Sequence, residues 1–146
     1  MTDLLLGRVL SFTADPFEIG PDAGPEAAQE AARIDEALVI AGGRILARGS
    51  AEALRRAYPN CRTHDYGNSL ISAGFVDAHV HYPQTAIIAS WGKRLIDWLN
   101  SYTFPEEMRF ADPAYAQAVA ARYLDLTLAH GTTSVCSYAT IHPASV

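Results

Sequence analysis

The sequence predicts an α/β protein whose second half begins a parallel β-sheet. Two β-rich runs, residues 75–80 and 132–140, flank helical segments, and the longest helical pattern directly precedes the second run. A strand, a crossover that contains a helix and a second strand form a βαβ unit, whose strands are parallel. The first seventy residues instead carry short β-rich runs separated by turns. We therefore predict two domains, residues 1–72 and 73–146.

Composition limits the classes of function. The 146 residues have a mass of 15.8 kDa and are 49% apolar, enough for a hydrophobic core. Eleven basic residues against sixteen acidic ones exclude nucleic acid and anionic membranes as expected partners. Two cysteines without a C-x-x-C pair fit a reducing compartment. Because no signal peptide or run of ~20 apolar residues is present either, we expect a cytoplasmic protein.

Turn signals define the elements of the first domain. A strand is expected over residues 4–12, and Gly42-Gly43 between two β-rich runs predicts a hairpin. Residues 15–36 hold seven acidic residues and one basic residue. We interpret them as an exposed insertion, with a short helix from Pro25 as the alternative. Ser50 is expected to cap a helix that extends to Tyr58.

Helix signals define the second domain in the same way. Residues 95–102 carry apolar side chains at helical spacing. Asp112 is a typical N-cap residue, Pro113 is typical of a first helical turn, and Gly131 is typical of a helix end. A helix is therefore expected over residues 113–130. Four aromatic residues in this domain are expected to pack in its core rather than around a ligand: Trp91, Trp98, Tyr102 and Phe104.

The pair His79 and His81 is the best candidate for chemistry. Side chains alternate between the faces of a strand, so both imidazoles project to one side, about 6.6 Å apart along the backbone. Two neutral imidazoles suit zinc, iron, copper or nickel. The alternative is a pair of half-buried polar residues with backbone partners. The position favours a site, because active sites of parallel α/β folds lie where the strands end.

A catalytic zinc usually has three protein ligands, and the remaining candidates are few. His64 precedes the first strand of the second domain, and His130 is expected to interact with a helix end. His142 follows the second strand. Three roles stay open for it: a metal ligand, a residue that supports a ligand, or a plain loop residue. Asp77 should point the same way as His79 but deeper, as a partner for backbone or for an imidazole. Cys136 is expected to pack as a small apolar residue.

The motif GFVDAHVH resembles the amidohydrolase superfamily, metal-dependent hydrolases whose first barrel strand ends in H-x-H. The segments HVHYPQ, LIDWLNSYTFPEEMRFADPAYA and HGTTSVCSYATIHP are similar, in order, to the guanine deaminases of that superfamily. The resemblance implies the start of a (β/α)8 (TIM) barrel, preceded by part of a small β-sandwich domain. The hairpin ALVIAGGRILARG matches the sandwich strands that lead to the barrel.

The resemblance also implies site residues. His79 and His81 match the two metal ligands of the first strand, Gln84 matches a glutamine that hydrogen-bonds the purine, and Trp98 matches an aromatic residue near the substrate pocket. The implied cofactor is zinc, with iron as an alternative. The implied reaction is hydrolysis of guanine to xanthine and ammonia, in purine catabolism, by a protein that is a homodimer when full length.

Other parts of that site have no counterpart in these residues. The family's proton-shuttling glutamate and its remaining ligands are expected beyond Val146, since a (β/α)8 barrel takes ~250 residues. We do not expect residues 1–146 alone to be active. Two alternatives stay open: an amidohydrolase deaminase of another azaheterocycle, and a non-catalytic truncated fragment.

Overall fold

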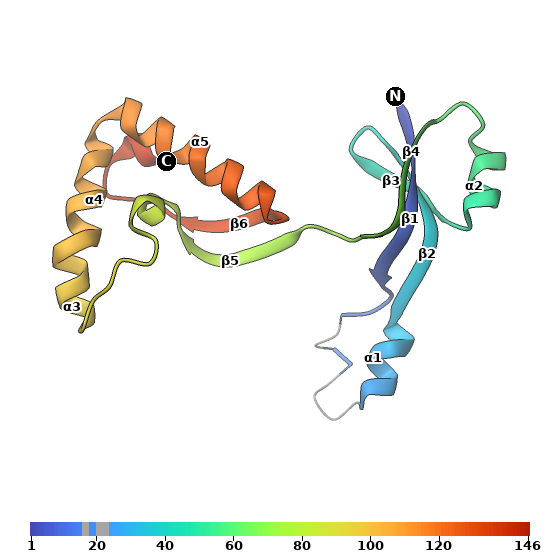
Figure 1. The fold of residues 1–146 in the computed structure, drawn as a ribbon, viewed down its shortest axis with the longest axis horizontal. Coiled ribbons are helices and arrows are strands. Elements are labelled where there is room, and N and C mark those ends of the chain that lie inside the picture. Colours follow the sequence, from blue (N-terminus) through green and yellow to red (C-terminus); the bar gives the residue numbers. More distant parts are fainter. Residues whose placement is uncertain (16–17, 20–23) are drawn as a thin grey trace. The chain divides into compact units, whose positions relative to one another are not determined.

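The computed structural model describes residues 1–15, 18–19 and 24–146. The chain divides into two compact units, Met1–Ala73 and Gly74–Val146. The division lies one residue from the predicted domain boundary, and both units are seen in Figure 1. No helix in the described part of the chain is long and apolar enough to cross a membrane.

The described residues of the first unit form a four-stranded sheet in the order β3-β2-β1-β4. Its strands are β1 (Thr2–Phe12), β2 (Ala32–Ala41), β3 (Arg44–Gly49) and β4 (Arg62–Ile71). The predicted strand 4–12 and the predicted hairpin are confirmed. Gly42 and Gly43 have φ angles of +56° and +73°, the left-handed pair that a tight two-residue hairpin turn requires.

One face of this sheet is covered by α2 (Ala51–Ala57), as the capping signal predicts. The Ser50 hydroxyl oxygen accepts a hydrogen bond from the Ala53 amide at 3.3 Å. Leu54 is thereby buried among apolar side chains from the two central strands: Leu4, Leu6, Ala37 and Val39. Each of these strands contributes residues two apart, which share a face.

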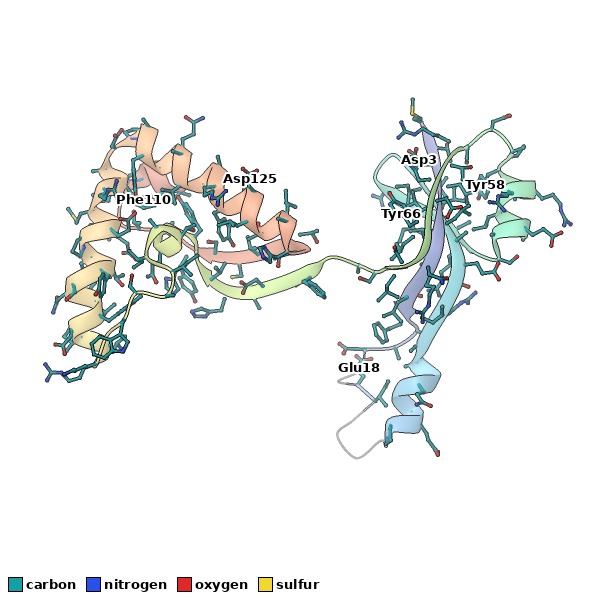
Figure 2. All side chains as sticks on the ribbon, viewed as in Figure 1. Asp3, Glu18, Tyr58, Tyr66, Phe110 and Asp125 are labelled. Atoms are coloured by element: carbon teal, nitrogen blue, oxygen red, sulfur yellow. The ribbon has the colours of Figure 1, made fainter. Side chains whose placement is uncertain are left out.

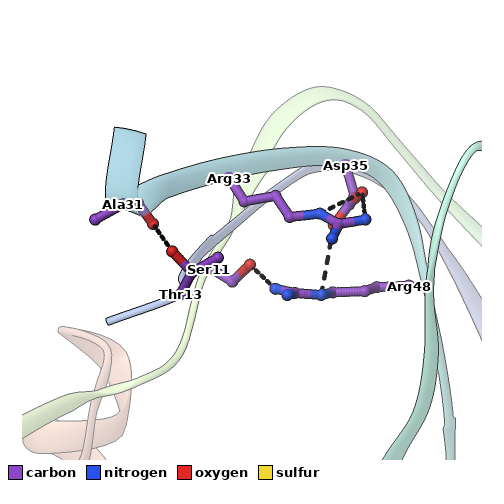
Figure 3. A network of polar contacts seen from close by, with 6 residues as sticks. All are labelled: Ser11, Thr13, Ala31, Arg33, Asp35 and Arg48. Atoms are coloured by element: carbon purple, nitrogen blue, oxygen red, sulfur yellow. Dashed lines mark hydrogen bonds and ion pairs between the residues drawn. The ribbon is translucent and has the colours of Figure 1, made fainter. Parts of the chain in front are cut away.

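The structure describes part of the acidic segment 15–36. Residues 16–17 and 20–23 lie outside the described residues; the alternative helix is present as α1 (Pro25–Ala31). Residues 32–36 belong to β2, so interpreting the whole of 15–36 as an exposed insertion is wrong there. The Asp35 carboxylate lies 3.1 Å from the Arg33 guanidinium and 3.7 Å from that of Arg48 on β3 (Figure 3). Arg48 also donates to the Ser11 hydroxyl on β1, which joins three strands.

The second unit has the predicted βαβ arrangement. Strands β5 (Phe75–His81) and β6 (Thr132–Tyr138) are parallel and connected through α5 (Pro113–Ala129). The Asp112 carboxylate accepts a hydrogen bond from the Ala114 amide at 2.9 Å, and Gly131 has a φ of +82°, so both predicted ends of this helix are confirmed. At their carboxyl ends the strands pair His81 with Tyr138.

The predicted helix 95–102 is part of a longer helical segment that changes type. It runs from α3 (Leu95–Trp98) through η2 (Leu99–Thr103), a π-helical turn, into α4 (Phe104–Met108) and η3 (Arg109–Ala111). Pro105 explains the wide turn: it has no N–H, and its ring would clash with the carbonyl four residues earlier in a regular α-helix.

The core of this unit is helical, and it differs from the expected one. It contains Tyr82 of η1 (Tyr82–Ile87), Phe110, and Ala116, Val119 and Tyr123 of α5. Phe110 is fully buried and labelled in Figure 2. The prediction of an aromatic core from Trp91, Tyr102 and Phe104 is wrong, since all three are exposed; Trp98 is half-buried. Cys136 is exposed as well, so it does not pack as a core residue.

Candidate functional site

His79 and His81 lie side by side at the carboxyl end of β5. Their ring centroids are 5.3 Å apart, as expected for neighbours on one face of a strand. Both residues are exposed, and their ring nitrogens form no hydrogen bond with any described residue. Two imidazoles are therefore close together with their nitrogens available for coordination.

Tyr138 at the end of β6 completes a group of three rings. Its centroid lies 4.8 Å from that of His79 and 4.8 Å from that of His81, and its plane is within 15° of the His81 ring. Sequence reasoning missed this residue. The parallel register that pairs His81 with Tyr138 could have identified it, because both close a strand of the same sheet.

Asp77 lies earlier on β5 and is half-buried. Its carboxylate accepts a hydrogen bond from the His79 backbone amide at 3.2 Å, so its partner is backbone rather than an imidazole. Burial raises the pKa of the Tyr123 hydroxyl, and the negative charge of Asp77 raises it further. The Asp77 side chain therefore bonds within the strand end that carries the two histidines.

A groove of about 580 Å³ brings the predicted site residues together. His79, His81, Gln84 and Trp98 all contribute to its lining. Ile87 of η1 and Leu126 of α5 supply apolar wall. Four positions selected from the sequence, spread over twenty residues, thus line one concave surface. A groove with apolar walls and few polar groups is the usual form of a small-molecule site.

Hydrogen bonds hold the side chains of both predicted ligand-contacting residues. The Gln84 amide nitrogen donates to a Glu107 carboxylate oxygen at 3.1 Å. The Trp98 indole nitrogen donates to the Ser90 carbonyl at 3.1 Å, which ties α3 to the loop before it. Glu107 is a second residue that sequence reasoning missed, since its contact depends on how the chain folds back across twenty-three positions.

The other histidines have different environments. His64 lies in β4, ahead of β5 as predicted, and its Nε2 is 2.8 Å from the Asp3 carboxylate. The Nδ1 of His130 lies 2.7 Å from the Leu126 carbonyl at the end of α5, as predicted for a helix-end histidine. His142 lies in the loop after β6, and its buried Nε2 has no hydrogen-bond partner among the described residues.

The donor set at β5 fits part of a metal centre. No group of three or more His, Cys, Asp or Glu side chains that could hold a metal occurs within residues 1–15, 18–19 and 24–146. The two imidazoles have the donor type that zinc and iron accept. The two histidines have the donor type and spacing for two ligands of such a centre, and a full coordination sphere would need more.

Comparison with protein families identifies this part of the chain. Residues 70–145 match the amidohydrolase family, and residues 37–60 match a bacterial imidazolonepropionase-like composite domain. The guanine deaminase of Escherichia coli K12 is 39% identical over 113 residues, which are 77% of this chain and 26% of that protein. The chain thus spans about a quarter of the length of this relative.

Solved structures agree with the described fold. The crystal structure of guanine deaminase from Bradyrhizobium japonicum matches 99% of this chain and 31% of its own, with a TM-score of 0.88 and 31% identity. A guanine deaminase from C. acetobutylicum, with guanine bound in its active site, matches 99% of this chain and 32% of its own, with a TM-score of 0.78 and 26% identity. Because the family match covers more than half of the residues, including both histidines, the chain belongs to the amidohydrolase family.

Proposed function

We propose that the whole protein containing residues 1–146 catalyses the metal-dependent hydrolysis of guanine to xanthine and ammonia. The observation that carries this proposal is the groove in which His79, His81, Gln84 and Trp98 meet. The similarity to guanine deaminases along most of the chain supports guanine as the substrate. A relative that binds guanine in its active site supports a purine ligand.

His79 and His81 would hold the metal, with zinc as the first choice and iron as the alternative. When bound, such a metal supplies a Lewis acid that makes hydroxide available near neutral pH. The remaining ligands and the proton-shuttling glutamate would come from parts of the whole protein outside residues 1–146. In the same proposal, β5 and β6 are the first strands of a (β/α)8 barrel, and the first unit is part of a β-sandwich.

Gln84 and Trp98 would bind the purine. An amide offers both a donor and an acceptor to the edge of a base. An indole offers a flat apolar surface against which a heterocycle can stack. The bond from Trp98 to Ser90 limits rotation of that ring before substrate arrives. The homodimer and the cytoplasmic location remain predictions.

A substrate panel tests this proposal. The whole protein, loaded with zinc or with iron, is incubated with guanine, adenine, cytosine and a triazine, and released ammonia is measured. We expect ammonia and xanthine from guanine, with turnover of the other bases lower by at least two orders of magnitude. Preferred turnover of another base would identify a different azaheterocycle deaminase. No turnover of any base, with metal bound, would favour the non-catalytic alternative.

A further inference from the structure

We propose that Glu107 is a positioning residue that fixes which end of the Gln84 amide faces the ligand. This inference rests on the proposed function only in taking the ligand to be a purine. Glu107 belongs to α4 and does not itself line the groove. It acts through Gln84, which does.

The chemistry of the pair determines the orientation of the amide. The Gln84 nitrogen lies 3.1 Å from a Glu107 carboxylate oxygen, and both residues are half-buried. An ionised carboxylate can only accept hydrogen bonds, so the amide must turn its nitrogen toward Glu107. Its carbonyl oxygen has no hydrogen-bond partner among the described residues and remains for a ligand. A charged acceptor also makes this bond stronger than one between neutral groups.

The helix holds Glu107 in place through the residue before it. The Glu106 side chain is only 7% exposed, and its carboxylate lies 3.0 Å from the Arg109 guanidinium. It also accepts a hydrogen bond from the Tyr115 hydroxyl on α5, and the Arg109 guanidinium lies 3.9 Å from the centre of the Tyr115 ring. Successive residues of a helix point about 100° apart, so fixing Glu106 toward α5 directs Glu107 to a different side.

The consequence is a preference in hydrogen bonding. With its oxygen presented, Gln84 accepts from an N–H of a purine ring or from an exocyclic amine. Without Glu107, the amide could rotate by half a turn and present its nitrogen, which would oppose that N–H. Glu107 would therefore improve binding of the substrate while leaving the chemical step almost unchanged.

Exchanging the two residues tests the proposal in the whole protein. In Glu107→Gln the orientation is no longer enforced, so KM for guanine should rise roughly tenfold, with kcat changed less than about twofold. Gln84→Glu alone places two carboxylates together and should raise KM further.

In the double variant Gln84→Glu with Glu107→Gln, the new amide donates to the new carboxylate, whose second oxygen faces the ligand. KM should then fall below that of Gln84→Glu alone; a double variant worse than both single variants would overturn the proposal.

A second readout is independent of activity. Nuclear magnetic resonance of protein labelled with ¹⁵N at glutamine side chains reports the amide protons of Gln84, assigned by their loss in Gln84→Glu. These protons should shift in Glu107→Gln and stay in place in Glu52→Gln, a matched change in the exposed pair with Arg56. Unchanged resonances in Glu107→Gln would overturn the proposal. A protein that shows the shift but does not turn over guanine would refute the proposed function and leave the role of Glu107 supported.

Discussion

The ring of His81 stacks on that of Tyr138, with centroids 4.8 Å apart and planes within 15° of parallel. The contact follows from the sheet, because the two residues pair at the carboxyl ends of β5 and β6. His79 lies at the same distance from Tyr138. The tyrosine therefore limits the rotamers of both imidazoles, which would reduce the entropy lost on binding the proposed metal.

Replacing either histidine should remove the metal. In the whole protein, His81→Ala or His79→Ala should weaken metal binding by at least about 100-fold, since even residues that only support ligands cost 10–100-fold. Elemental analysis after dialysis against a chelator measures the metal that stays bound. The control is His130→Asn, because His130 also lines the groove but bonds the end of α5. Equal metal loss in the control would contradict the ligand assignment.

The indole bond of Trp98 should matter for substrate affinity. Trp98→Phe keeps an aromatic ring but loses the donor to the Ser90 carbonyl, so KM for guanine should rise by roughly threefold to tenfold. Gly92→Ala should act in the same direction, because an added Cβ would lie 2.7 Å from the Trp98 Cβ. Trp91→Phe is the matched control, since Trp91 is 71% exposed. Steady-state kinetics on the whole protein measure KM for each variant. A larger rise in KM for Trp91→Phe than for Trp98→Phe would contradict the role of the indole hydrogen bond.

The buried carboxylate of Glu106 should stabilise the second unit. Glu106→Gln removes the buried negative charge that lies 3.0 Å from the Arg109 guanidinium, so the free energy of unfolding should fall by about 1–3 kcal/mol. The exposed pair of Glu52 and Arg56 provides the comparison, and Glu52→Gln should change stability by less than about 1 kcal/mol. Urea unfolding of the whole protein, followed by circular dichroism, measures both. A larger loss in Glu52→Gln would refute the role of burial.

Acid should loosen the pairing of β1 with β4. Hydrogen bonds from His64 and then from Arg62 hold the pKa of the Asp3 carboxyl below its ordinary value. A depressed pKa means that the charged form stabilises the fold above pH ~4, and this stabilisation is lost as the pH falls through the lower folded value.

Asp3→Asn should therefore be less stable than the parent protein at neutral pH and less sensitive to acid below pH ~4. Thermal unfolding measured from pH 7 to pH 2 follows the difference between the two proteins. Asp125→Asn, at an exposed position on α5, is the control (Figure 2). A difference between Asp3→Asn and its parent that stays constant down to pH 2 would contradict the assignment.

Local signals predicted most elements, and pairing between distant segments accounts for what was missed. The helix capped by Asp112 and the Gly42-Gly43 hairpin depend on neighbouring residues, so the sequence is sufficient to find them. Strand β4 was not predicted because RTHDYGNSLI lacks alternating apolar residues; its parallel pairing with β1 defines it.

The candidate site shows the same division. His79 and His81 follow from the period of one strand, and their position near Gln84 and Trp98 agrees with the family resemblance. Tyr138 lies beside the histidines because β5 and β6 pair in parallel, and Glu107 lies beside Gln84 after the π-helical turn that precedes Pro105. Neither of these can be inferred from spacing along the chain.

The oxygen atom that xanthine gains provides the most direct test of guanine hydrolysis by the whole protein. The whole protein, loaded with metal, is given guanine in water enriched in ¹⁸O, and the xanthine formed is analysed by mass spectrometry while ammonia is assayed. Hydrolytic deamination predicts one ¹⁸O atom in each xanthine and one ammonia for each guanine consumed. Metal-loaded protein that leaves guanine unchanged, or forms xanthine without the label, would contradict the proposed hydrolytic deamination.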